Sequence, residues 1–212
     1  SKNSLNVSKK NSFRRFTKLK PDYIIHCAAL VNADLCEKKK RLAKENIFNG
    51  TKNIIQFAKK NKSKIFYPQS FLIYKSSNKK VDENTLPKPL SVYGKYKLKS
   101  EQFLLKSYKN SLIVRMGGLF GGEKIDNNFV GKITQHISKL IKSGIKELEI
   151  GDRIWQPTYT DDLAYNSLIL LAKKKDGVYN MASIGSCSFF TLTKKIIEYL
   201  KLSKKIRIKK NY

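Results

Sequence analysis

A phenol and an amine stand at a spacing that could build a proton donor. Tyr93 and Lys97 lie in a segment that predicts a helix, because apolar residues recur at Leu98, Leu104 and Leu105. Residues four apart share one helix face, so the phenol and the ammonium can converge on one point. A neighbouring ammonium favours the phenolate, and we therefore expect Lys97 to lower the pKa of Tyr93 toward the range useful for proton transfer.

A serine hydroxyl is expected to complete this set. The β-branched and aromatic run Ile65–Pro68 predicts a buried strand that ends near Ser70. From that strand end, Ser70 could hold a carbonyl oxygen by a hydrogen bond while Tyr93 exchanges the proton. The alternative is that YxxxK occurs by chance in a lysine-rich chain, with both residues on a solvated helix face.

The surrounding elements alternate between strands and helices. The apolar run 23–28 predicts a strand covered on both faces, residues 41–60 predict one long helix, and residues 63–70 predict the next strand. This order indicates a βαβ unit with a right-handed crossover and a parallel sheet. Ligands of such sheets bind outside the carboxyl ends of the strands, where the small pair Ala28–Ala29 and Ser70 both fall.

The second half of the chain continues the alternation. Further expected elements are a strand over 111–116, a helix over 127–143, a strand over 148–150, a helix over 160–173, a strand over 177–182, a helix from Thr191 and an edge strand over 206–208. Gly117, Gly118, Gly121 and Gly122 follow the first of these strands, where they allow either close backbone approach or simply a turn.

Two single residues carry open interpretations. His26 lies inside the apolar run 23–28, which favours a hydrogen-bonded core histidine over a catalytic one. Trp155 is the only tryptophan and lies in a predicted loop. It could stack on a ring or fill an interface between two lobes.

Bulk composition excludes several classes of protein. The 212 residues are 41% hydrophobic, which suits one domain or one domain plus a small lobe. No apolar run reaches the roughly 18 residues of a membrane span, and the polar N-terminal segment has no apolar stretch typical of a secretory signal. Cys27, Cys36 and Cys187 are odd in number and lack metal-ligand spacing. We therefore expect a reduced, cytoplasmic setting and no metal site.

The formal charge of +28 raises the question of a nucleic-acid partner. Nearly all of the basic residues are lysines, and they are spread over the chain as solvent-side positions of helices. This favours compositional drift over a dedicated polyanion site. We expect no specific nucleic acid and no membrane as partner, and only a general, salt-dependent attraction to acidic molecules.

Several segments, in this order, resemble the extended short-chain dehydrogenase/reductases, and in particular their dTDP-4-dehydrorhamnose reductase branch. They are PDYIIHCAAL (Pro21–Leu30), ENIFNGTKNI (Glu45–Ile54), PLSVYGKYKLKSEQ (Pro89–Gln102), LIVRMGGLFGG (Leu112–Gly122), NNFV (Asn127–Val130) and DRIWQPTYTDDLA (Asp152–Ala164). Each motif alone is weak, but their common order makes the resemblance specific.

The resemblance implies an α/β fold. We expect a Rossmann-like parallel sheet with helices on both faces, N-terminally incomplete, plus a small C-terminal α/β substrate lobe. The incomplete dinucleotide-binding domain would comprise residues 1–124 and 154–174, and the substrate-binding lobe residues 125–153 and 175–212.

The resemblance also implies a function. It is NAD(P)H-dependent reduction of a nucleotide-linked 4-keto-deoxysugar in nucleotide-sugar biosynthesis, with NADP or NAD as cofactor and a homodimer left open. The implied catalytic residues are Ser70, Tyr93 and Lys97, the implied cofactor contacts are Ala28, Ala29, Tyr93, Lys97, Gly117 and Gly118, and the implied substrate contacts are Val31, Asn128, Arg153 and Trp155. The alternatives are an NAD-dependent sugar-nucleotide epimerase or dehydratase, a non-catalytic binding subunit, and a truncated fragment.

The chain departs from the family pattern at two places. The family begins with a strand and a G-x-x-G-x-x-G turn whose amides hold the pyrophosphate, but no glycine precedes Pro21. The chain is therefore expected to be either a fragment or a shortened relative. At the strand end, the branch usually reads S-T-D-Y-V-F, whereas this chain has Gln69-Ser70-Phe71-Leu72-Ile73-Tyr74. The hydroxyl is kept at Ser70, but the acidic residue and the tyrosine that follow it in the family are replaced.

Overall fold

The computed structural model describes residues 5–77, 79–122 and 126–211. It forms two compact units, the first from residues 1–116 and 167–181 and the second from residues 117–166 and 182–212. The predicted domain boundary at residue 124 lies outside the described residues, and the predicted assignment of functions to two domains stays a prediction. No helix in the described part of the chain is long and apolar enough to cross a membrane.

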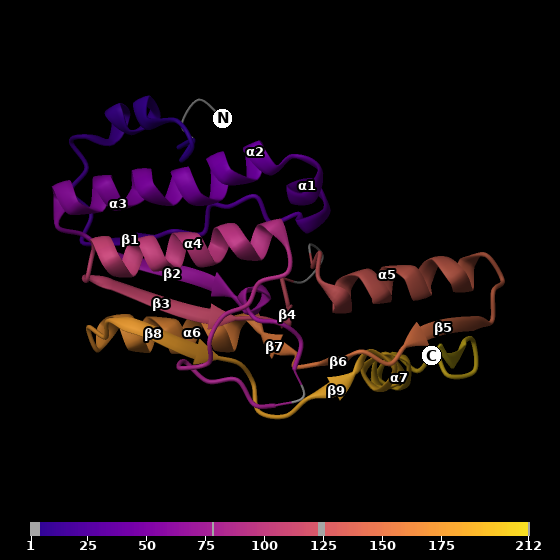
Figure 1. Ribbon diagram of the computed structural model, residues 1–212. Coiled ribbons are helices and arrows are strands. Elements are labelled where there is room, and N and C mark those ends of the chain that lie inside the picture. Colours follow the sequence, from indigo (N-terminus) through magenta and orange to yellow (C-terminus); the bar gives the residue numbers. More distant parts are fainter. Residues whose placement is uncertain (1–4, 78, 123–125, 212) are drawn as a thin grey trace. The chain divides into compact units, whose positions relative to one another are not determined.

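A four-stranded parallel sheet forms the centre of the first unit (Figure 1). Its strands, in spatial order, are β1 (Tyr23–Ile25), β2 (Lys64–Ser70), β3 (Ser111–Met116) and β8 (Gly177–Met181). Every neighbouring pair is parallel, so the carboxyl ends of all four strands lie at one edge of the sheet. The predicted parallel sheet is confirmed, and Ser70 ends one of its two central strands.

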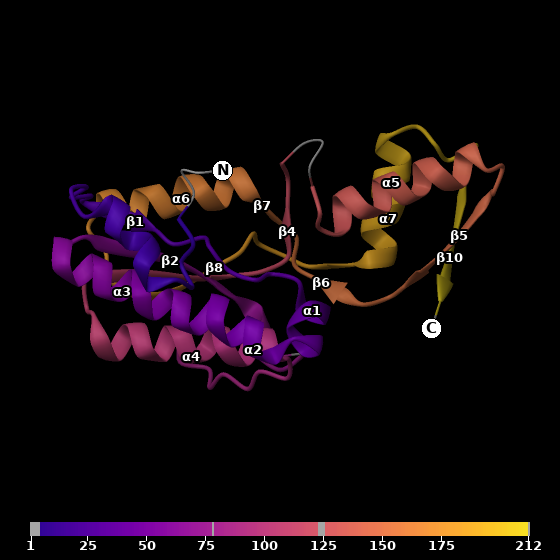
Figure 2. The same cartoon turned by 90° about the horizontal axis from the view of Figure 1, so that it is seen from above.

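Helices cover both faces of this sheet, as predicted (Figures 1 and 2). On one face lie α3 (Gly50–Asn61) and α4 (Val92–Ser107). On the other face lies the part of α6 (Thr160–Ala172) that belongs to this unit, residues 167–172. Buried apolar residues of α3, α4 and the strands form the core between these two helices and the sheet. They include Ile54, Ile55, Ala58, Leu104, Ile65, Tyr67 and Ile113.

Strand β1 is shorter and more exposed than predicted. The strand ends at Ile25, and the side chains of Tyr23 and Ile25 are 46% and 57% exposed. Among the described residues β1 pairs only with β2, so it forms an edge of the sheet. The prediction of a strand over residues 23–28 that is covered on both faces is therefore wrong, because apolar composition alone does not distinguish a central strand from an edge strand.

The long helix predicted over residues 41–60 is confirmed as a continuous helical stretch, but part of it is π-helical. It runs through α2 (Lys40–Ala43), the π-helical segment η2 (Lys44–Asn49) and α3 without a break, and the short helix α1 (Ala33–Lys38) precedes it. A π-helical segment holds one extra residue in its turn, which a 3.6-residue apolar period does not reveal. A side chain at Gly50 would come within 2.9 Å of Val7 Cγ2, so this glycine lets the N-terminal segment with its 3₁₀ helix η1 (Lys10–Phe16) pack on the start of α3.

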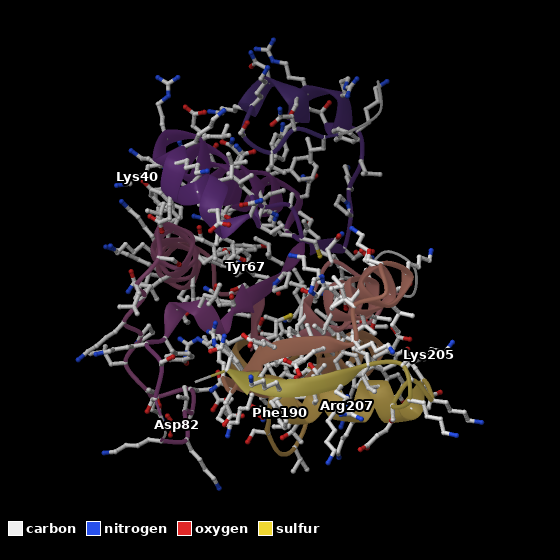
Figure 3. All side chains as sticks on the ribbon, turned by 90° about the vertical axis from the view of Figure 1, so that its right-hand side faces the viewer. Lys40, Tyr67, Asp82, Phe190, Lys205 and Arg207 are labelled. Carbon is white, nitrogen blue, oxygen red and sulfur yellow. The ribbon has the colours of Figure 1, made fainter. Side chains whose placement is uncertain are left out.

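The second unit is a small α/β unit. Helices α5 (Phe129–Lys142) and α7 (Phe189–Tyr199) pack on the parallel pair β5 (Glu147–Gly151) and β10 (Arg207–Asn211). Two shorter pairs join β4 (Leu119–Phe120) to β7 (Thr158–Tyr159) and β6 (Ile154–Trp155) to β9 (Cys187–Ser188). Phe190 packs against the core of this unit, whereas Lys205 and Arg207 are exposed (Figure 3). The predicted strands over 148–150 and 206–208 are confirmed as β5 and β10.

Lysines occupy left-handed backbone positions directly after helices. Lys62 ends α3 with φ of 59°, and its N–H donates to the carbonyl of Ala58. Glycine is the residue best suited to this conformation, which costs a residue with a Cβ about 1–2 kcal/mol.

We therefore predict that Lys62→Gly raises the free energy of unfolding by about 0.5–1 kcal/mol, since the relief of strain exceeds the added freedom of the unfolded chain. Urea denaturation followed by circular dichroism measures the change. The control is Lys60→Gly, two residues earlier within α3, where the same substitution is expected to destabilise. A loss of stability in Lys62→Gly would contradict the argument.

Candidate active site

The start of α4 brings Tyr93 to the end of β2. Ser91 caps the helix, because its Oγ accepts a hydrogen bond from the N–H of Gly94 at 3.0 Å. Tyr93 lies in the first turn, is 8% exposed, and its phenol lies close enough to the side chain of Ser70 for the serine to lower its pKa. The structure thus brings two of the three predicted catalytic side chains close together.

Gly94 permits this approach. A Cβ at Gly94 would overlap the carbonyl oxygen of Leu72, in the short 3₁₀ helix η3 (Phe71–Ile73) that follows Ser70. The same turn is fixed to the serine, whose Oγ accepts from the N–H of Leu72 at 3.2 Å. The absence of a side chain at position 94 therefore sets how closely the tyrosine helix approaches the serine turn.

Lys97 lies one helical turn after Tyr93 and is also buried, with 4% of its surface exposed. Its Nζ donates to the carbonyl oxygen of Pro68 at 2.7 Å and lies 3.9 Å from the centroid of the Tyr67 ring. Burial lowers the pKa of Lys97 to about 7, although the carboxylate of Glu101 acts in the opposite direction. Both members of YxxxK are thus buried, which excludes the alternative of a solvated helix face.

The predicted lowering of the Tyr93 pKa is wrong in this structure. Burial raises the pKa of Tyr93 above its ordinary value, and the nearby Ser70 side chain offsets only part of this rise. Lys97 does not provide the expected compensation, because its ammonium contacts Pro68 and Tyr67 of the strand. The phenol therefore stays protonated at neutral pH.

His26 is a core histidine, as predicted. It is 4% exposed, and its Nε2 lies 3.0 Å from Oγ1 of Thr51 on α3. Burial, together with the charge of Lys97, lowers the pKa of His26 to about 3. The imidazole is therefore neutral at physiological pH and forms part of the helix–sheet interface.

A buried ion pair that sequence analysis missed lies beside the site. Glu101, one turn beyond Lys97, is 1% exposed and accepts from Nη2 and Nε of Arg115 at 2.5 and 3.2 Å. Arg115 also donates to the Tyr74 hydroxyl and to the Glu83 carbonyl. A sequence signal existed, because an arginine inside the apolar strand SLIVRM and a glutamate on the Tyr93–Lys97 helix face need each other as partners.

Gln69 joins this pair to the serine. Its Nε2 donates to the carbonyl of Lys97 at 3.0 Å and to Oε2 of Glu101 at 2.9 Å. Its Oε1 accepts from the N–H of Ser70 at 2.8 Å. One amide side chain thus fixes the serine and the lysine turn of α4 to one another, at a position where the resembled family carries a serine. Nothing in the sequence signals this role.

The remaining predicted residues of the first unit follow β1. Ala28 is exposed, Ala29 is half-buried and Val31 is 71% exposed. Cys27 precedes them and lies within electrostatic reach of Lys97. Small, accessible side chains at the carboxyl edge of a parallel sheet allow a flat ring to approach the backbone, which fits the nicotinamide end of a dinucleotide.

The other predicted contacts belong to the second unit. Gly117 and Gly118 directly follow β3, and Gly118 has φ of 65° in a place where a Cβ would overlap the carbonyl oxygen of Gln156. Trp155 packs edge-to-face on Phe129 and Phe189, with ring centroids 5.7 and 5.6 Å away. Asn128 precedes α5 and Arg153 precedes β6, and both are exposed. The tryptophan is thus part of an aromatic cluster within its own unit.

Comparison with known proteins agrees with this geometry. The model of the RmlD substrate binding domain matches residues 1–210. The chain belongs to this family. A dTDP-4-dehydrorhamnose reductase from Bacillus anthracis, solved in complex with NADP, has a TM-score of 0.87 and 28% identity, over 98% of this chain and 72% of that one. The RmlD-type fold predicted from the sequence is therefore confirmed.

The RmlD relatives differ in their own descriptions. The spore coat polysaccharide biosynthesis protein SpsK of Bacillus subtilis is 26% identical over 93% of this chain and 68% of its own length. The dTDP-4-dehydrorhamnose reductase of Aggregatibacter actinomycetemcomitans is 29% identical over 81% and 58%. The methionine adenosyltransferase 2 subunit beta of Xenopus tropicalis is 27% identical over 73% and 46%. The chain thus spans about half to two thirds of these curated relatives.

We predict that removing one member of the buried ion pair destabilises the first unit strongly. Arg115→Met or Glu101→Met leaves a buried charge without its partner and is expected to lower the free energy of unfolding by about 3–5 kcal/mol. The double variant is expected to be more stable than either single variant. Urea denaturation measures all three. The control is Arg41→Met, since the Arg41–Glu45 pair is exposed and is expected to contribute under about 0.5 kcal/mol.

The lowered pKa of Lys97 predicts that this residue reduces the stability of the folded state in a pH-dependent way. Between pH 7 and 10.5 the unfolded chain binds a proton that the folded chain does not, so this group makes stability rise with pH across that window. Lys97→Met removes the cost, and its stability relative to wild type is expected to be about 2.5 kcal/mol more favourable at pH 6 than at pH 9. Urea denaturation at both pH values measures this. Lys95→Met, an exposed position on the same helix, is the control, and equal differences for the two variants would refute the prediction.

Proposed function

We propose that this protein is an NAD(P)H-dependent reductase of a nucleotide-linked 4-keto-deoxysugar, acting in nucleotide-sugar biosynthesis. The observation that carries the proposal is the placement of the Ser70 side chain close to the Tyr93 phenol, with buried Lys97 one turn further along α4. These groups lie at the carboxyl edge of a parallel sheet, where such folds bind their ligands. Membership of the RmlD family and the reductases among its relatives support it.

The geometry suits reduction of a carbonyl. The Ser70 hydroxyl can donate a hydrogen bond to the substrate oxygen and orient it beside Tyr93. Because burial keeps Tyr93 protonated, the phenol is in the form that can give a proton to that oxygen. NADPH or NADH, when bound, would supply the hydride for the carbonyl carbon. Lys97 favours the negative charge left on Tyr93 only from a distance, because the direct contacts of its ammonium are with Pro68 and Tyr67.

The residues present fit the nicotinamide end of NADP or NAD. Ala28 and Ala29 are small and accessible after β1, and Gly117 and Gly118 follow β3. The sequence contains no G-x-x-G-x-x-G turn for the pyrophosphate. We propose Val31, Asn128, Arg153 and Trp155 as substrate contacts, on the exposure of the first three and on the resemblance of the segment Asp152–Ala164, which contains Trp155, to the dTDP-4-dehydrorhamnose reductase branch. A cytoplasmic location and a homodimer stay predictions.

The competing function is a non-catalytic binding subunit. The match to the methionine adenosyltransferase 2 subunit beta favours it, because that relative is described as a subunit of an enzyme. The set of Ser70 with buried Tyr93 and Lys97 opposes it, since a binding module has no need to bury a lysine at a cost in free energy. An epimerase or dehydratase would use the same residues with NAD kept bound, and the products formed would separate it from a reductase.

Turnover of a Tyr93→Phe variant tests the proposal. Purified protein is mixed with NADPH or NADH and a dTDP-linked 4-keto-6-deoxysugar, and cofactor oxidation is followed at its absorbance band. Loss of the phenolic proton is expected to lower kcat by about 10²–10⁴-fold with little change in cofactor affinity. Tyr96→Phe, three residues along the same helix, is the control and is expected to keep activity. Cofactor binding without turnover in the wild type would favour the binding subunit, and unchanged turnover in Tyr93→Phe would remove the proposed acid.

A further inference from the structure

The direct contacts of the Lys97 ammonium come from β2. Strand β1 ends early, with Ile25 opposite Phe66, and the N–H of His26 donates to the carbonyl of Phe66. Alternate carbonyls of a strand point the same way, so the carbonyl of Pro68 also points toward the β1 side but lies beyond the end of that strand. Lys97 Nζ donates to this carbonyl at 2.7 Å.

The ring of Tyr67 supplies the second contact. Its centroid lies 3.9 Å from Lys97 Nζ, well within the range of a cation–π interaction. Tyr67 is 2% exposed and lies in the interior of the first unit (Figure 3). The ring is packed in the hydrophobic core with Ile54, Ile55 and Leu104, so its position is fixed by packing while its face meets the ammonium.

Other charged and titratable groups near Lys97 do not replace Pro68 and Tyr67 as direct contacts of its ammonium. Glu101 on α4 acts on the ammonium through space, but its oxygens accept from Arg115 and Gln69. After β1, His26 is neutral and the side chain of Cys27 is exposed. When no carboxylate is bonded directly to a buried ammonium, dipoles and the faces of aromatic rings must stabilise its charge.

We propose that Tyr67 is a positioning residue whose ring face fixes the Lys97 ammonium beside the site and favours its charged form. The role of Tyr67 in catalysis rests on the proposed function, because the positive charge of Lys97 is needed when Tyr93 gives up its proton. Its effect on Lys97 does not depend on turnover. A desolvated cation–π contact is expected to change the proton affinity of the amine about tenfold.

The test changes the electrostatics of the ring at nearly constant shape. The protein is labelled with ¹³C-lysine, the signal of Lys97 is assigned with Lys97→Met, and its titration is followed by NMR in wild type and in Tyr67→Phe. In two further variants, position 67 carries 4-fluorophenylalanine or 3,4,5-trifluorophenylalanine, which progressively remove the negative charge of the ring face. Tyr67→Phe is expected to keep the wild-type midpoint within about twofold in proton affinity, and trifluorophenylalanine to lower that affinity about tenfold, with the monofluoro variant between them.

Equal titration midpoints of Lys97 across the fluorinated series would overturn the proposal. A midpoint that rises with fluorination would also overturn it. Thermal unfolding of each variant checks that the fold is intact, and the monofluoro variant, which changes size least, keeps the test open if the trifluoro variant fails to fold. Where the wild type reduces the keto-sugar, fluorination is expected to lower kcat at pH values above 7 with little change in KM. A graded NMR titration in a protein that shows no turnover would support the role of Tyr67 and reject the proposed function alone.

Discussion

The buried ion pair between Glu101 and Arg115 is the interaction on which the arrangement of the site depends. It joins α4, which carries Tyr93 and Lys97, to the central strand β3, and one of its carboxylate oxygens, Oε2, also accepts from Gln69. Desolvation makes such a pair costly to form, but once it exists the loss of either partner is costlier still. The helix therefore has one favourable position against the sheet, and the phenol reaches the serine from that position.

Burial explains both the order and the chemistry of the site. The same exclusion of water that fixes Gln69 and Lys97 keeps Tyr93 protonated and lowers the pKa of the lysine to about 7. These shifts have a common cause, since each disfavours the charged form of its group. In a reduction the phenol begins neutral and ends charged, so a nearby cation matters most after the proton has left. The geometry of β2, which holds the ammonium through Pro68 and Tyr67, is consistent with that order of events.

The sequence predicts the sheet, the helices on both faces and the meeting of Ser70 with Tyr93, because these follow from strand ends and a four-residue spacing that local pattern records. It does not predict the π-helical segment before Gly50 or the exposure of β1, since both depend on packing partners. The sequence also predicts the wrong direction for the pKa shift of Tyr93. The four-residue spacing indicates that an ammonium is near, but not that the effect of burial on the pKa is larger than the effect of the ammonium. The role of Gln69 cannot be predicted from the sequence, because a glutamine indicates such a role only when its three hydrogen-bond partners are known.

The aromatic cluster of the second unit has a practical consequence. Trp155 is the only indole in the chain, and it is wedged edge-on against two phenylalanines that themselves stack with centroids 4.0 Å apart. Its emission spectrum therefore reports the solvation of that unit alone, while the far-ultraviolet signal reports the secondary structure of the whole chain. Melting curves from the two signals would coincide if both units lose structure in a single cooperative transition and separate if they do not.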